Sequence, residues 1–189
     1  MTPTPTMTAT GLPTADEVVA FWREAGEDAW FTKDAAFDAR FRDRFWHAHF
    51  AAARRELDGF MATPEGALAL MILLDQFPRN SFRGTGHMYA TDPLALAFAR
   101  TADARGDAAD VDPPLRVFLS LPYSHSEVLA DQERAVELTR PTGGDAHAHA
   151  IGHRDVIARF GRFPHRNAIL GRVTTAEEQA FLDGGGFAG

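Results

Sequence analysis

The sequence predicts an all-α fold, a single-domain array of about seven to eight helices. Apolar residues recur at helical spacing over long segments, and loops rich in proline and glycine separate these segments. No segment shows the alternation of apolar and polar residues that is typical of a half-buried strand. Together these observations favour helices packed on helices around one core.

The first helix is predicted to begin at a capping box, in which Thr14 is followed three residues later by Glu17. A long helix is expected next, from about residue 34 to 57, because aromatic residues such as Phe37 and Phe41 recur there at helical spacing. We interpret this aromatic stripe as core packing rather than as a cofactor site.

A central helix is expected after residues 63–65, where a threonine, a proline and a glutamate form a typical helix start. Residues 67–74 are apolar on all sides, so other helices must enclose this one. Pro78 is expected to end it. Asp75 would then lie in the last turn, where the helix dipole disfavours its charge, and we expect an arginine to compensate.

In the second half of the chain, Pro122 is expected to break a short helix. Residues 124–127 have the pattern of a second capping box and are expected to start a helix that ends near Leu138. Residues 141–150 are expected to form a loop before the helix that carries His153. Gly161 and Pro164 are expected to stop that helix, and residues 174–177 to cap a last short one. The predicted boundaries are a disordered N-terminal tail at 1–13, one helical domain at 14–183 and a flexible C-terminal tail at 184–189.

Composition excludes several classes of function. Cysteine is absent, which excludes disulfides, thiolate zinc sites and cysteine catalysis. The formal net charge of -7 argues against a nucleic-acid-binding protein. No signal peptide or membrane span is recognisable, so we expect a cytoplasmic protein with no membrane partner.

Polar residues gather in three segments beside strongly apolar helices: residues 75–83, 125–132 and 153–167. In the third segment Asp155, Arg159 and Arg162 have the spacing of one helix face. Such a stripe can hold an anion, with the aspartate orienting a guanidinium, or it can be a surface salt-bridge ladder. Both readings remain open from the sequence.

His125 is expected in the first turn of a helix, where the positive potential favours a neutral imidazole that can act as a base. The predicted catalytic residues are His125, Glu127 and Asp75. The predicted ligand-binding residues are Gln76, Arg79, Asn80, Arg83, Asp131, Gln132, His153, Asp155, Arg159, Arg162, His165, Arg166 and Asn167. No cofactor is predicted, and a divalent metal is disfavoured because these segments contain no helical pair of ligands at metal-binding spacing.

Several motifs resemble those of the bacterial domain of unknown function 924 family. They include Leu74-Asp75-Gln76-Phe77-Pro78-Arg79-Asn80, Ala90-Thr91-Asp92-Pro93, His125-Ser126-Glu127 and Arg159-Phe160-Gly161-Arg162-Phe163-Pro164-His165-Arg166-Asn167. The resemblance covers nearly the whole chain. It implies an all-helical fold grouped with tetratricopeptide-like superhelices, and it implies no established activity.

Three functions are compatible with these observations. The favoured one is a pocket lined by Arg, His and Asp that binds a small anionic ligand, a phosphate or a carboxylate, with histidine-based acid/base chemistry. The alternative is a tetratricopeptide-like module that binds an acidic peptide or protein partner. In the third, the polar segments form a structural network that fixes helix packing.

Overall fold

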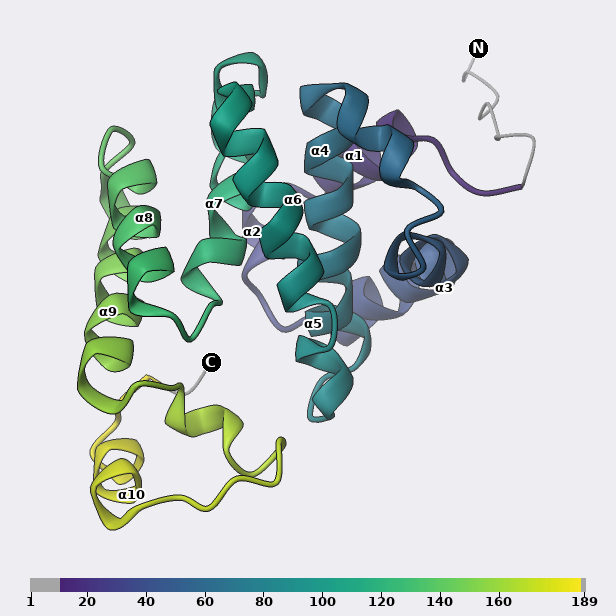
Figure 1. Cartoon of the computed structure of the whole chain (residues 1–189). Helices are drawn as coiled ribbons and strands as arrows, with labels where there is room; N and C mark the ends of the chain where they lie inside the picture. Colours follow the sequence, from purple (N-terminus) through teal and green to yellow (C-terminus); the bar gives the residue numbers. More distant parts are fainter. Residues whose placement is uncertain (1–10, 188–189) are drawn as a thin grey trace. The chain divides into compact units, whose positions relative to one another are not determined.

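The computed structural model describes residues 11–187, which are all-helical and contain no β-strand, as predicted (Figure 1). The chain divides into two compact units. The first contains the chain up to Arg83 together with His87–Leu119, and the second contains Gly84–Gly86 together with the chain from Ser120 onward. Most of the predicted N-terminal tail lies outside the described residues. The single helical domain at 14–183 and the flexible tail at 184–189 stay predictions.

From residue 11 onward, the first unit contains six α-helices and the beginning of a seventh. They are α1 (Ala15–Ala25), α2 (Glu27–Trp30), α3 (Ala35–Ala53), α4 (Pro64–Met71), α5 (Phe77–Ser81), α6 (Asp92–Arg105) and the start of α7 (Val117–Ser124). The Thr14 and Glu17 capping box and the Thr63 N-cap are present as predicted. The long helix α3 ends at Ala53, four residues before the predicted end.

Aromatic rings and the apolar helix α4 form the core of the first unit. Trp22, Phe41 and Phe45 are fully buried, and the Trp22 and Phe41 ring centroids lie 5.1 Å apart. This confirms the predicted packing stripe on α3. Residues 67–74 are fully buried, as expected for a helix that is apolar on all sides, and α4 packs against α1 and α6.

The prediction that Pro78 ends the central helix is wrong. After α4 the backbone widens into one π-helical turn, Ile72–Gln76, and then continues as α5 with Pro78 in its first turn. The widened turn and the missing proline N–H disturb the regular hydrogen bonds of the helix. Side chains bind the carbonyls concerned: His49 Nδ1 lies 2.9 Å from Leu73 O, and the Thr91 hydroxyl donates to Leu74 O.

The second unit contains the end of α7, then α8 (Leu129–Thr139), α9 (Gly144–Phe160) and α10 (Ala176–Asp183). A short turn joins α8 to α9, and the two helices lie side by side (Figure 1). Gly161, with a φ of 68°, ends α9 as predicted, because glycine adopts this left-handed conformation without strain. The capping box of α10 is Thr175 with Glu178, within one residue of the predicted cap.

Three local predictions for this part of the chain are wrong. Pro122 lies inside α7 rather than after it. Residues 124–127 do not cap α8, which begins at Leu129 without a side-chain cap. Residues 144–150 belong to α9 rather than to a loop. In the described part of the chain, no helix is long and apolar enough to cross a membrane.

Candidate functional site

The first unit holds a buried ion-pair network on the π-helical turn. Arg79 Nη1 lies 3.1 Å from Asp75 Oδ1 and 2.8 Å from Asp92 Oδ1, and Arg79 Nη2 donates to Asp92 Oδ2 over 3.0 Å. Gln76 donates to Asp75 Oδ2. Burial lowers the pKa of Arg79, but the Asp75 and Asp92 carboxylates outweigh it and leave the pKa raised. The expectation that Asp75 needs a cation is confirmed, with Arg79 in that role.

Asn80 and Arg83, two predicted ligand-binding residues, bind one carboxylate on α3. Asn80 Nδ2 donates to Asp38 Oδ1 over 2.7 Å, and Arg83 donates to both Asp38 oxygens over 2.7 and 3.1 Å. These contacts join the end of the central helix to the start of α3. An anionic ligand would compete with Asp38 for these donors.

A histidine pair lies behind the π-helical turn. His49 is fully buried, and its Nδ1 must donate to Leu73 O because a carbonyl only accepts. His49 Nε2 is then an acceptor, so His87 Nε2, 2.9 Å away, donates to it. Burial lowers the pKa of His49 to about 4 and also lowers the pKa of His87. The sequence analysis did not single out His87.

In the second unit, polar side chains surround the fully buried ring of Phe163, which follows α9. The ring centroid of His153 lies 5.6 Å from that of Phe163, and that of His165 lies 5.5 Å from it. The Arg166 guanidinium carbon lies 4.6 Å from the same ring, and the His125 and His153 rings are 6.3 Å apart. We call His125, His153, His165 and Arg166 the histidine cluster.

The environment keeps two imidazoles of the cluster neutral. Burial, followed by the charges of His125, His149 and Arg166, lowers the pKa of His153 to about 4. Burial, followed by the charges of Arg166 and His153, lowers the pKa of His165 to about 4 as well, although the Glu127 carboxylate acts in the opposite direction. The charged neighbours that act on His153 are thus all basic residues, which indicates positive potential at its ring.

The Nδ1 atoms of the same two histidines have different surroundings. His153 Nδ1 lies 2.7 Å from His149 O, one turn earlier in α9, and therefore carries the hydrogen. His165 Nδ1 is buried and has no hydrogen-bond partner among the described residues. Phe187 covers both rings, with centroid distances of 4.4 Å to His153 and 5.0 Å to His165.

Glu127 connects two segments of the second unit. The Phe163 N–H donates to Glu127 Oε1 over 2.9 Å, and Arg172 donates to both carboxylate oxygens over 2.8 Å each. Burial raises the pKa of Glu127, but the bonds from Arg172 and Phe163 and the charge of Arg166 outweigh it and leave the pKa lowered. Glu127 is therefore an ionised carboxylate that helps to fix the backbone at Phe163.

His125 does not lie in the first turn of a helix, as predicted, but just after the end of α7, where its N–H donates to Leu121 O over 2.9 Å. Gln132 donates to the carbonyls of Ser124 and Ser126 over 2.7 and 2.6 Å, and the Ser126 hydroxyl donates to Asp131 over 2.7 Å. Gln132 and Asp131 therefore hold the turn that carries His125.

The Asp155, Arg159 and Arg162 stripe is divided among different partners. Asp155 accepts from Arg154, and Arg159 pairs with the exposed Glu177 at 3.0 Å. Arg162 lies beyond the end of α9 and pairs with the buried Glu178 at 2.6 Å. Asn167 Nδ2 donates to Glu178 over 3.2 Å. The bond from Arg162, the Thr175 N–H and the bond from Asn167 lower the pKa of Glu178 to about 2.

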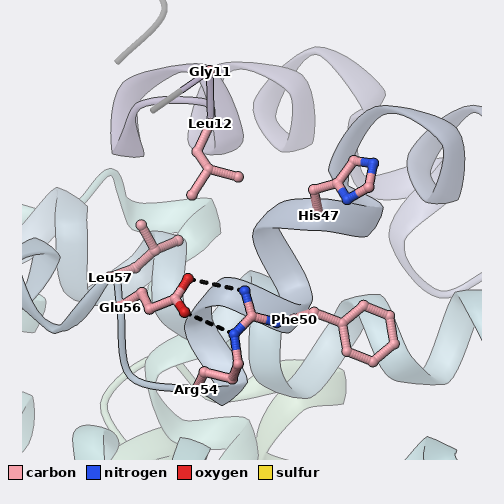
Figure 2. Close-up of a pocket in the computed structure, with 7 residues that line it drawn as sticks. All are labelled: Gly11, Leu12, His47, Phe50, Arg54, Glu56 and Leu57. Atoms are coloured by element: carbon pink, nitrogen blue, oxygen red, sulfur yellow. Dashed lines mark hydrogen bonds and ion pairs between the residues drawn. The ribbon is translucent and has the colours of Figure 1, made fainter. Parts of the chain in front are cut away.

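Two surface hollows lie in the first unit, and none of the predicted site residues lines either of them. One, of about 440 Å³, is lined by Arg42, Asp43, Trp46 and His47. The other, of about 570 Å³, is bordered by Leu12, Phe50 and Leu57, and by Arg54 and Glu56, which bind each other through two hydrogen bonds (Figure 2). In the first hollow Arg42 likewise lies 3.6 Å from the Asp43 carboxylate. Each guanidinium thus has a carboxylate partner, and neither hollow has the chemistry of the predicted anion site.

Over residues 11–187, no group of three or more His, Asp or Glu side chains is arranged to hold a metal ion. The structure also brings in residues that the sequence analysis missed. Arg172 and Phe187 contact the site from segments without any recognisable motif. His149 fixes the ring of His153, but the glycines at 143 and 144 led us to expect a loop there.

Comparisons with known proteins identify the family of the chain, and that family is described as one of unknown function. The family model described as "Bacterial protein of unknown function (DUF924)" matches residues 18–186. A solved structure, that of the protein of unknown function ATU0120 from Agrobacterium tumefaciens, is similar, with 60% sequence identity and a TM-score of 0.88. The match covers 90% of this chain and 97% of that chain. No curated protein matches the chain.

Proposed function

This chain belongs to the bacterial DUF924 family, and we propose that its second unit binds a small oxyanion, a phosphate or a carboxylate, at the histidine cluster. The observation that carries this proposal is the gathering of two imidazoles and one guanidinium around the buried ring of Phe163, with the His125 imidazole next to that of His153. Basic groups that lie so close together repel one another when charged, and a bound anion relieves that repulsion.

The charged groups that act on His153 and His165 are basic except Glu127, and the Glu127 carboxylate is paired with Arg172, so the surroundings favour an anion over a cation. Arg166 is buried, and its charge is among the causes that lower the pKa of His153 and of His165. An oxyanion near these rings gains Coulomb attraction in a poorly solvated place, where such attraction is stronger than in water. The two neutral imidazoles can also take up a proton beside a bound ligand, which provides a base for acid/base chemistry.

The other predicted site residues have supporting roles in this proposal. Glu127, together with Arg172, holds the backbone of Phe163, and Gln132 holds the turn before α8. Arg159 and Arg162 join α9 and the segment after it to α10. We assign the Asp75 and Arg79 network of the first unit to stabilising the π-helical turn.

The test is isothermal titration calorimetry of the purified protein with inorganic phosphate, acetate and citrate. The wild type should bind at least one of these ligands, and Arg166→Gln should weaken binding about tenfold or more, because a charge-assisted hydrogen bond is lost. Arg159→Gln is the matched control, since Arg159 is exposed and paired with Glu177. Circular dichroism should show that both variants keep their helices.

An acidic peptide, the alternative ligand, would present the same carboxylate chemistry. A peptide with a free C-terminal carboxylate and the same peptide as its amide separate the two cases. Binding of the peptide without binding of any small anion would favour the binding-module function. Absence of binding in the wild type, or equal losses in the Arg166→Gln and Arg159→Gln variants, would contradict the proposed site.

A further inference from the structure

Which ring nitrogen of His153 carries the hydrogen determines what kind of oxyanion can bind beside the ring. Nδ1 lies 2.7 Å from His149 O, and because the carbonyl only accepts, Nδ1 is the donor. A neutral imidazole carries one hydrogen, so His153 Nε2 holds a lone pair. The two ring nitrogens point away from each other, and Nε2 therefore points away from the backbone of α9.

A ligand beside His153 Nε2 must donate a hydrogen bond to it. The rings of His125, Phe163 and Phe187 lie around His153, at centroid distances of 6.3, 5.6 and 4.4 Å. An anion that has no hydrogen to donate would displace water from Nε2 and leave this acceptor without a partner, which is destabilising.

We propose that the histidine cluster selects an oxyanion that carries a hydroxyl hydrogen, such as hydrogen phosphate, over one that carries none, such as sulfate. Sulfate has only acceptor oxygens at neutral pH, so it would place a lone pair against that of His153 Nε2. Hydrogen phosphate offers acceptor oxygens to Arg166 and its hydroxyl to His153. This inference rests on the oxyanion site proposed above and names its substrate class.

The buried Nδ1 of His165 offers a ligand a second polar contact. It has no hydrogen-bond partner among the described residues, and the ring centroid lies 5.0 Å from that of Phe187. If Nδ1 holds a lone pair, it adds a second acceptor for a ligand hydroxyl, and dihydrogen phosphate has two. If Nδ1 carries the hydrogen, it donates to an oxygen of the ligand. Neither tautomer removes the mismatch between sulfate and His153.

The experiment compares inorganic phosphate with sodium sulfate at pH 7 by isothermal titration calorimetry on the full-length protein. The wild type should bind phosphate at least about tenfold more tightly than sulfate. In His153→Gln the new amide can donate, so the ratio should fall close to one. His149→Ala is the matched control: it keeps the backbone carbonyl that orients His153 and should keep the ratio.

The outcomes separate two claims: that the histidine cluster binds an oxyanion, and that it selects phosphate over sulfate. Equal binding of phosphate and sulfate by the wild type overturns the selection and leaves the oxyanion site intact. Binding of neither anion, nor of any carboxylate, overturns the site itself. If His153→Gln does not fold, the wild-type ratio still decides, and nitrogen NMR of His153 gives a second test. With phosphate bound at pH 7, the neutral ring should keep its hydrogen on Nδ1 and accept a hydrogen bond at Nε2, whereas a neutral ring with its hydrogen on Nε2 would overturn the inference.

Discussion

At the residue scale, burial separates two ion pairs that link the α9 region to α10. Glu178 is 3% exposed and accepts from Arg162, Asn167 and the Thr175 N–H. Glu177 is 66% exposed in its side chain and pairs with Arg159. The two glutamates are adjacent in the sequence, so they form a matched pair for mutation.

Glu178→Gln should lower the free energy of unfolding by about 2 kcal/mol or more, because it leaves Arg162 without its charged partner and weakens the capping box of α10. Glu177→Gln should cost less than about 1 kcal/mol, as is usual for an exposed pair. Urea denaturation monitored by circular dichroism measures both values. Equal losses would mean that the buried pair does not hold α10 in place.

The sequence could identify the residues of this region but not their partners. The helical spacing of Asp155 and Arg159 is real, and both lie on α9. Their ion pairs depend on neighbours that periodicity does not specify: Arg154 occupies Asp155, and α10 supplies the carboxylate for Arg159. Docking of α10 is a tertiary event, so the local pattern carried no information about it.

At the element scale, the π-helical turn Ile72–Gln76 is the main feature that local rules missed. Proline normally ends a helix because it lacks an N–H and its ring clashes with the preceding turn. Here the widened turn lets the helix continue, and side chains from other elements bind the carbonyls of Leu73 and Leu74. Sequence rules could predict the caps at Thr14 and Thr63, because caps depend on adjacent residues.

Thr91→Val should test this support directly. The Thr91 hydroxyl is buried and donates to Leu74 O, so its loss should lower the free energy of unfolding by about 1 to 3 kcal/mol. Thr101→Val is the control, since that exposed hydroxyl only donates to Ala97 O in its own helix and should change stability by less than about 0.5 kcal/mol. Chemical denaturation of both variants gives the comparison. Similar values would show that the Thr91 bond does not stabilise the turn.

At the scale of the whole molecule, the all-α class and the central apolar helix were predictable, because composition and periodicity act over many residues. The assembly of the site was less predictable. The sequence pointed to His153, His165 and Arg166, and the structure gathers them around Phe163. The neutral state of His153 and His165 depends on burial, and Phe187 contributes from a segment near the end of the described chain.

The net charge of the whole chain is opposite in sign to the charged groups around His153. The chain carries a formal net charge of -7, whereas basic residues are the charged neighbours of His153. Since exposed charges are screened over about 8 Å at physiological salt, the local surroundings rather than the net charge govern an anion at the cluster. Oxyanion binding should therefore persist despite the acidic composition of the chain.

The most direct measurement is a pH titration of the histidine side chains by nitrogen NMR, with and without inorganic phosphate. Without ligand, His153 and His165 should stay neutral until about pH 4, because burial and nearby positive charge lower the pKa of each. A bound anion stabilises the imidazolium, so phosphate should raise both pKa values towards the usual value of about 6.5. By linkage, the protein should then bind phosphate more tightly as the pH falls from about 6.5 to about 4. His147, which lies on α9 and contacts Thr139, is the internal control and should not respond. Unchanged pKa values for His153 and His165 at high phosphate concentration would contradict an oxyanion site at the histidine cluster.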